Sequence, residues 1–71
     1  MIPISEIKEG DIFLRYYVNN SLLWRVQKVS KSEKMVQIQA FDRDANPIGS
    51  PMWKKNTDNI FQESNRYEAK L

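Results

Sequence analysis

The sequence contains no cysteine and no histidine among its 71 residues. The absence of cysteine excludes disulfide bonds and thiol nucleophiles, and the absence of both residue types excludes the usual zinc sites. The side chain that most often acts as a general base near neutral pH is also missing. We therefore expect a protein that is not an enzyme and that has no cofactor and no metal site.

Long apolar runs and glycines are also scarce. No apolar run approaches the ~20 residues that cross a membrane, and residues 1–7 lack the basic start and the long apolar stretch of a signal peptide. We therefore expect a cytoplasmic protein with no membrane partner. The chain has only two glycines, and they do not form a glycine-rich phosphate-binding loop.

The length and the hydrophobic content bound the size of the fold. Residues 1–71 are enough for a single domain, and 41% of them are hydrophobic. A chain of about this size buries only about 60% of the surface that it exposes when unfolded, so its core is small.

Alternation of apolar and polar residues, the period of a β-strand, is the strongest pattern in the sequence. It occupies residues 12–18, 22–29 and 35–41, and a weaker segment follows at 48–54. In the first three segments the even-numbered residues are mostly apolar and are expected to face the core: Ile12, Leu14, Tyr16, Val18, Leu22, Trp24, Val26, Val36, Ile38 and Ala40. Pro51 cannot donate a ladder hydrogen bond, so we expect the fourth strand at an edge or at a bulge.

Short polar turns separate these segments, which predicts antiparallel pairing. The sequence therefore predicts an all-β fold, a small antiparallel barrel of four or five strands over about residues 8–62. Closure is favoured because it leaves no strand edge unpaired. The polar tail, residues 63–71, fits either a short C-terminal helix or a frayed end.

The segment Lys8–Ile12 before the first strand, followed by a strand centred on Trp24, resembles SH3-like small barrels such as Tudor and KOW domains. Gly10 and Asp11 match the opening of a KOW motif, whose later glycine has no counterpart here. The resemblance covers roughly residues 5–62. It implies an SH3-like barrel with a binding role, and it names no ligand.

The turn lengths predict which residues lie opposite one another. A three-residue loop at Asn19–Ser21 and a five-residue loop at Ser30–Lys34 fix the register of the first three strands. The outer face of the sheet is then expected to carry three rows, Tyr17–Leu23–Phe41, Arg15–Arg25–Gln39 and Phe13–Gln27–Gln37.

The predicted contact between Arg15 and Arg25 is unfavourable, because like charges directly opposite each other lower stability. Such a pair beside aromatic residues indicates a site where a bound anion offsets the repulsion. Arginine binds phosphate and carboxylate groups bidentately, and aromatic faces stack on bases. Alternatively, a register shifted by two separates the arginines, and the N-terminal segment or the tail covers Phe13 and Phe41.

The segment Met52–Lys55 is the second candidate. If Met52 points inward, Trp53 is exposed beside Lys54 and Lys55, a pattern suited to base stacking and phosphate contact. Alternatively, Trp53 closes one end of the barrel and the lysines only solubilise the surface. Asp42–Asn46 matches the start of a calcium loop, but a proline follows where the loop requires glycine, so we expect no metal there.

Positive charge is concentrated in the middle of the chain. The net charge is +2, but residues 15–55 carry eight basic and three acidic side chains, a net of +5. We therefore predict a non-enzymatic binding module that contacts nucleic acid through Arg15, Tyr17, Arg25, Gln27, Gln39, Phe41, Trp53, Lys54 and Lys55. The alternative is a protein–protein interaction module that regulates or inhibits a larger partner, which the low net charge and the exposed aromatic residues favour.

Overall fold

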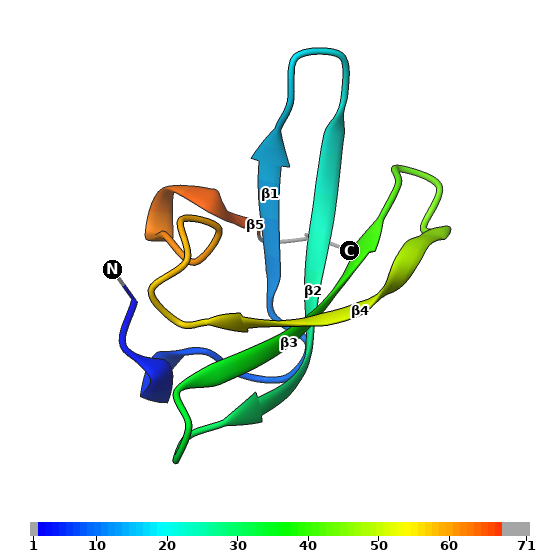
Figure 1. Cartoon of the computed structure of the whole chain (residues 1–71). Coiled ribbons are helices and arrows are strands. Elements are labelled where there is room, and N and C mark those ends of the chain that lie inside the picture. The colour runs from blue at the N-terminus through cyan, green and yellow to red at the C-terminus, as the bar shows by residue number, and fades with distance from the viewer. Residues whose placement is uncertain (1, 68–71) are drawn as a thin grey trace.

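The computed structural model describes residues 2–67, which form one antiparallel sheet and two short 3-10 turns (Figure 1). In chain order the elements are η1 (Ile4–Glu6), β1 (Ile12–Tyr16), β2 (Ser21–Ser30), β3 (Met35–Phe41), β4 (Pro47–Lys55), η2 (Glu63–Asn65) and β5 (Arg66–Tyr67). The strands lie side by side in the order β4-β3-β2-β1-β5. No α-helix occurs within residues 2–67, so the predicted all-β fold is confirmed.

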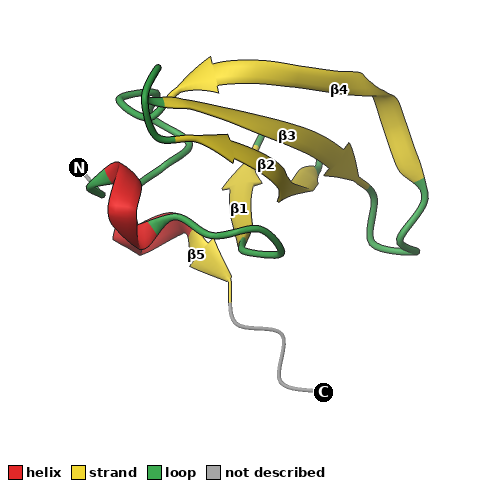
Figure 2. Ribbon diagram, turned by 90° about the horizontal axis from the view of Figure 1, so that it is seen from below, coloured by secondary structure: helices red, strands yellow, loops and turns green. Residues whose placement is uncertain are grey.

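The sheet is open. β4 and β5 are its two edges, and no pairing joins them within residues 2–67. The predicted closure into an SH3-like barrel is therefore not confirmed. Figure 2 shows η1 and η2 on the same side of β3 and β4. The buried residues Ile2, Ile7, Ile60 and Phe61, which come from segments next to these turns, cover the core on that side.

The pairing of β2 with β3 follows the prediction over its first half. Leu23 lies opposite Phe41 and Arg25 lies opposite Gln39, as the turn length indicates. The predicted pair of Gln27 with Gln37 is wrong, because a bulge shifts the register after Val26 and places Lys28 opposite Gln37. A bulge adds one residue to one strand and turns the following side chains to the other face.

The predicted register of β1 against β2 is wrong. Phe13 pairs with Trp24 and Arg15 pairs with Leu22, so the odd-numbered residues of β1 share the face of the core residues of β2. The hairpin loop has four residues, 17–20, and is closed by the Tyr17 N–H donating to the Asn20 carbonyl at 2.7 Å. Because side chains alternate between faces, this difference of an odd number of residues turns every side chain of β1 over.

The core lies on the face of the sheet against which Ile2, Ile7, Ile60 and Phe61 pack, which we call the inner face. Residues from β1, β2 and β3 meet residues from outside the sheet here, and the buried hydrophobic set is Ile2, Ile7, Phe13, Trp24, Val26, Val36, Ile38, Ala40, Ile60 and Phe61. The Phe13 and Phe61 rings meet edge to face with centroids 5.3 Å apart. Ile2 and Ile7, which precede the first strand, are among the most deeply buried of these residues.

Arg66 ties the end of the described chain to its beginning. Its Nη1 donates to Asp11 Oδ2 at 3.0 Å, its Nε donates to Glu63 Oε2 at 3.1 Å, and its guanidinium lies over the Phe13 ring. The hydrogen bond to Glu63, with that to Asp11, raises the pKa of Arg66 above its ordinary value. The first part of the predicted polar tail is thus η2 and β5, and residues 68–71 lie outside the described part.

The fourth strand is an edge strand with an irregularity, as Pro51 predicted. β4 extends over Pro47–Lys55, and its register against β3 shifts between Ile38 and Ala40. Gly49 lies within this irregularity with φ at 68°, a left-handed conformation that glycine adopts at little cost. The extra residues of β4 bend the strand at this point. The carbonyl groups of Ile48 and Gly49 then accept hydrogen bonds from the side chain of Gln39 on β3.

Candidate functional site

The second face of the sheet, which we call the outer face, is the side away from the core. Cross-strand pairs place on this face, among others, Ile12, Leu14, Leu23, Arg25, Lys28, Gln37, Gln39, Phe41, Trp53, Lys55 and Tyr67. The buried segments around Ile2, Ile7 and Phe61 pack against the inner face instead. The outer face is therefore the surface on which the sheet presents regularly spaced side chains to a partner.

The charge on this face has one sign. Arg25, Lys28 and Lys55 are exposed at outer positions of β2 and β4, and no Asp or Glu occupies an outer strand position in residues 2–67. Trp53 is 46% exposed on the edge strand β4, where it lies opposite Gln37, and Gln37 lies opposite Lys28 on its other side. Cations contact phosphates and exposed aromatic side chains stack on bases, so this face carries both kinds of group that bind nucleic acid.

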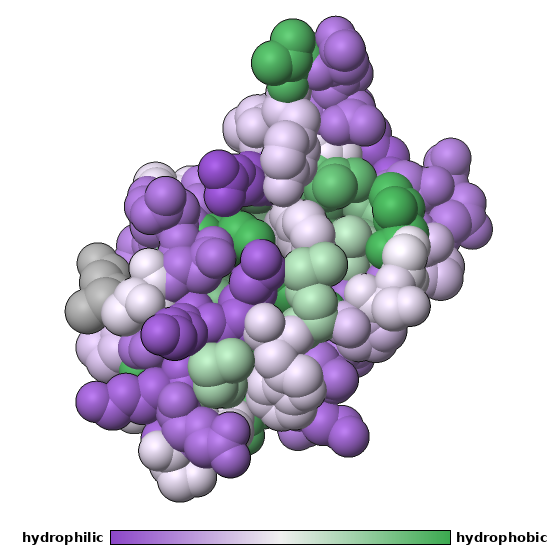
Figure 3. Space-filling model, viewed as in Figure 1, coloured by the Kyte–Doolittle hydropathy of each residue, from purple (hydrophilic) through white to green (hydrophobic). Residues whose placement is uncertain are grey.

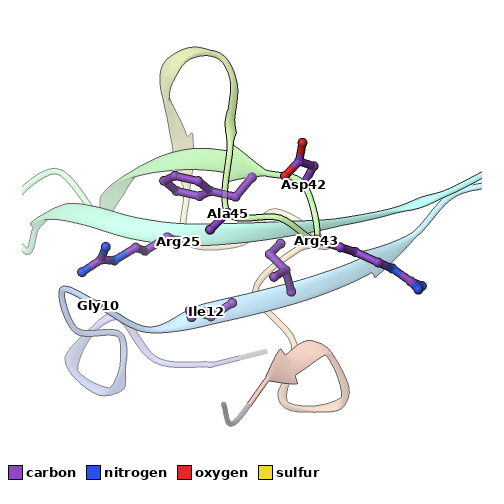
Figure 4. A pocket seen from close by; sticks show the side chains of 8 residues that line it. Gly10, Ile12, Arg25, Asp42, Arg43 and Ala45 are labelled. Atoms are coloured by element: carbon purple, nitrogen blue, oxygen red, sulfur yellow. The ribbon is translucent and has the colours of Figure 1, made fainter. Parts of the chain in front are cut away.

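A shallow pocket of about 280 Å³ lies at one end of the outer face. Its floor is apolar and comes from three strands, with Ile12 from β1, Leu23 from β2 and Phe41 from β3. Arg25 and Arg43 lie at its opposite ends, and their side chains point away from each other (Figure 4). A second hollow of about 320 Å³ shares Leu23 and Arg43 with this pocket, extends towards Tyr67 and has a lining of mixed polarity.

The β3–β4 turn forms one wall of the pocket and is organised by Asp42. Oδ1 of Asp42 accepts hydrogen bonds from the backbone N–H groups of Asp44 and Asn46, both at 2.9 Å. These bonds, that from Asn46 first, hold the pKa of Asp42 below its ordinary value. The resemblance of this segment to a calcium loop therefore has another explanation, an Asx turn, and no group of three or more possible metal ligands occurs in the described residues.

The same turn presents Arg43 to the outer face. Nη2 and Nε of Arg43 donate to Ser21 Oγ at 3.2 and 3.4 Å, which directs the guanidinium towards the start of β2. Arg43 was not among the predicted binding residues, because it lies in a turn, where the alternation that identifies the exposed residues of a strand does not apply. The contact with Ser21 could not be predicted either, because Ser21 and Arg43 lie 22 positions apart in the sequence.

Asp42 predicts a pH dependence of stability. Its lowered pKa means that the ionised carboxylate stabilises the turn above the ordinary titration range of aspartate, and that this contribution is lost as the pH falls through the folded-state value. We expect the melting temperature of Asp42→Asn to fall less than that of the wild type between about pH 5 and about pH 2. Thermal unfolding followed by circular dichroism measures this, with Asp44→Asn as the control in the same turn; parallel curves for all three proteins would contradict it.

Gln39, a predicted binding residue, is buried and has a structural role. It is 6% exposed, and its Nε2 lies 3.1 Å from the carbonyl oxygens of Ala40, Ile48 and Gly49. Two of these acceptors belong to the irregularity of β4, so the amide joins β3 to an edge strand that lacks regular pairing there. Gln39 therefore contributes to the position of β4 and is not available to a ligand.

We expect Gln39→Leu to lower the free energy of unfolding by about 1–3 kcal/mol, because the bulge carbonyls lose their buried donor. Gln37→Leu, on the same strand and face, is the matched control, and we expect it to change the stability by less than about 0.5 kcal/mol. Urea unfolding followed by far-UV circular dichroism measures both. Equal losses for the two variants would show that the amide of Gln39 has no such role.

The structure separates Arg15 from Arg25. Arg25 pairs with Ile12 and faces outward, whereas Arg15 pairs with Leu22 on the inner-face side of the hairpin. The Arg15 guanidinium lies 5.8 Å from the centroid of the Tyr17 ring, so these two predicted residues contact each other at the hairpin. The predicted row of adjacent arginines is therefore wrong, and its cause is the register of β1.

The remaining predicted residues fall into two groups. Arg25, Phe41, Trp53 and Lys55 share the outer face, to which Lys28, Ile12 and Leu23 must be added. Gln27 lies at the bulge of β2, and Lys54 pairs with Val36 and is directed to the inner-face side. The interpretation of Met52–Lys55 that places Met52 inward agrees with its pairing to the buried Ile38.

The inner-face side also carries a hollow near the loops. It has a volume of about 480 Å³, lies between the β1–β2 hairpin and the β3–β4 turn, and includes Leu22 and Ile48 among its lining residues. In Figure 3 apolar residues gather between the upper part of β2 and the beginning of β4, while most of the visible surface is hydrophilic. Polar loop residues line most of this hollow, so it has no continuous apolar floor like that of the pocket beside Arg25.

The chain has no match among family models, curated proteins or solved structures. The described residues also contain no helix that is long and apolar enough to cross a membrane.

Proposed function

We propose that this protein is a non-enzymatic binding module that contacts nucleic acid through the outer face of its sheet. The observation that carries the proposal is that Arg25, Lys28 and Lys55 share one face of the sheet with the exposed Trp53, and that this face has no carboxylate at its strand positions within residues 2–67. The phosphate backbone is a regular array of negative charge, and neutralising it releases counterions. Although the net charge is only +2, the charge that faces a partner here is entirely positive at the strand positions.

The architecture agrees with this role. A curved antiparallel sheet with short turns packs one face against the core and leaves the other face to a ligand. We also propose that the fold is related to SH3-like barrels, although β4 and β5 do not pair with each other within residues 2–67.

Fluorescence anisotropy with short labelled DNA and RNA oligonucleotides tests the proposal. We expect binding at low salt that weakens as a straight line on a log–log plot between about 50 mM and about 200 mM salt. A labelled polyglutamate peptide distinguishes a nucleic-acid ligand from any polyanion, and we expect it to bind more weakly. Absence of oligonucleotide binding at about 50 mM salt would refute the proposal.

A second candidate function, protein–protein interaction, is favoured by one observation. β4 pairs only with β3 within the described residues, and Ile48, Met52 and Trp53 are 40–46% exposed along it. A partner strand can add to such an edge through backbone hydrogen bonds. We propose this as the alternative, in which the chain regulates a larger partner; a stoichiometric complex recovered by pull-down and lost when Ser50 is replaced by proline would support it.

A further inference from the structure

We propose that the nucleic acid is single-stranded and that the pocket between Arg25 and Arg43 holds one unpaired base. This inference rests on the proposed function and adds the class of nucleic acid to it. The base would lie on the apolar floor of Ile12, Leu23 and Phe41, and the phosphates on its two sides would lie at the two arginines.

The apolar floor is the first reason to expect an unpaired base. Positively charged side chains are sufficient to bind a duplex, because a duplex presents its phosphates outward and keeps the faces of its bases stacked on one another. A single strand can place the face of a base on an aromatic or aliphatic surface, and such stacking tolerates any sequence. Phe41 supplies an aromatic surface in this pocket, and Ile12 and Leu23 supply aliphatic surface beside it.

The placement of the arginines is the second reason. Arg25 extends from the middle of β2, whereas Arg43 extends from the β3–β4 turn, and Figure 4 shows them directed to opposite sides of the pocket. A strand that crosses the pocket therefore meets a cation before and after the base that enters it. The hydrogen bonds from Arg43 to Ser21 Oγ hold one of these cations in position.

One carboxylate, that of Asp42, also lines the pocket and repels a phosphate. Its Oδ1 accepts two backbone hydrogen bonds within the turn, and its Oδ2 lies 3.4 Å from Asn46 Nδ2. In Figure 4 this side chain is directed to the side of the turn away from Ile12. The negative charge is thus held by the turn, and the neighbouring Arg43 offsets it.

The test compares three labelled probes of the same length and label: a single strand, its duplex, and a single strand in which every base is replaced by an abasic site. We expect the single strand to bind roughly tenfold more tightly than the abasic strand, because the phosphates are the same and only stacking differs. We also expect it to bind more tightly than the duplex at the same salt concentration.

Two variants locate the base. Phe41→Leu keeps the floor apolar but removes the aromatic face, and we expect it to lose about tenfold in affinity for the single strand while its affinity for the abasic strand is unchanged. Tyr17→Leu removes an exposed aromatic ring from the hairpin outside the pocket, and we expect no change. A melting curve for each variant checks that it is folded.

The outcomes distinguish this inference from the proposed function. Equal binding of the single strand, the duplex and the abasic strand would overturn the inference and leave nucleic-acid binding intact. An equal loss in Phe41→Leu and Tyr17→Leu would overturn the placement of the base in this pocket. No binding of any probe at low salt would overturn both.

Discussion

Replacing Arg25, Lys28 and Lys55 with glutamine is expected to weaken binding of a single-stranded oligonucleotide roughly 100-fold at about 50 mM salt. All three side chains are exposed on the outer face, where β2 and β4 present them to the same partner. Each phosphate contact with a single strand contributes about 0.7 to the log–log salt slope, so three contacts contribute about two. The triple variant should therefore lose affinity mainly at low salt and approach the wild type at high salt.

A variant with the same loss of charge on other surfaces is the control. Lys8→Gln, Lys31→Gln and Lys54→Gln also remove three positive charges, but Lys8 and Lys31 lie in loops and Lys54 is directed to the inner-face side of β4. If net charge alone determined binding, the two triple variants would show the same reduced slope. We expect the control to retain most of the slope, and equal effects would contradict the assignment of the outer face.

Replacing Phe13 with alanine is expected to lower the free energy of unfolding by about 3–5 kcal/mol. Phe13 is fully buried, packs edge to face on Phe61 and lies under the Arg66 guanidinium. A domain of this length has a total stability of roughly 4–11 kcal/mol, from about 0.05–0.15 kcal/mol for each of its 71 residues. The expected loss is therefore a large share of the total stability, and it brings a domain at the lower end of this range close to unfolding at room temperature.

Leu14→Ala is the matched control, because Leu14 is the next residue and lies on the outer face. We expect it to cost about 1 kcal/mol or less, since the side chain is only half-buried. The register that turn lengths predicted reverses this order, with Leu14 in the core and Phe13 outside. Urea unfolding of the two variants therefore tests the register, and a larger loss for Leu14→Ala would contradict it.

The sequence predicted β2, β3 and β4 well, and the reason for its error in β1 is specific. Before the bulge of β2 and throughout β3 the even-numbered residues are apolar, from Leu22 to Val26 and from Val36 to Ala40, and most of their odd-numbered neighbours are polar, so the alternation has one solution there. In β1 the residues Ile12, Phe13 and Leu14 are all apolar, so the pattern fits either face. The choice then depended on the hairpin loop, which has four residues instead of three.

The candidate site was only partly predictable for a related reason. Arg25, Phe41, Trp53 and Lys55 lie in regular strand segments and were found from their period. Lys28 follows a bulge, and bulges have no reliable signal in a single sequence. The alternation in β3 predicted that Gln39 is exposed. Its amide instead donates hydrogen bonds to carbonyl groups of β4 that are available only because β4 is irregular there.

The two tryptophans provide the most direct test of the claim that the outer face binds nucleic acid. Trp53 is exposed on that face, whereas Trp24 is 8% exposed in the core, and its indole Nε1 has no hydrogen-bond partner within residues 2–67. In a ¹H–¹⁵N spectrum of the protein titrated with a single-stranded oligonucleotide, we expect the indole signal of Trp53 to shift progressively and that of Trp24 to remain in place. A titration that saturates while the Trp53 signal does not move, or that shifts only the Trp24 signal, would contradict the account.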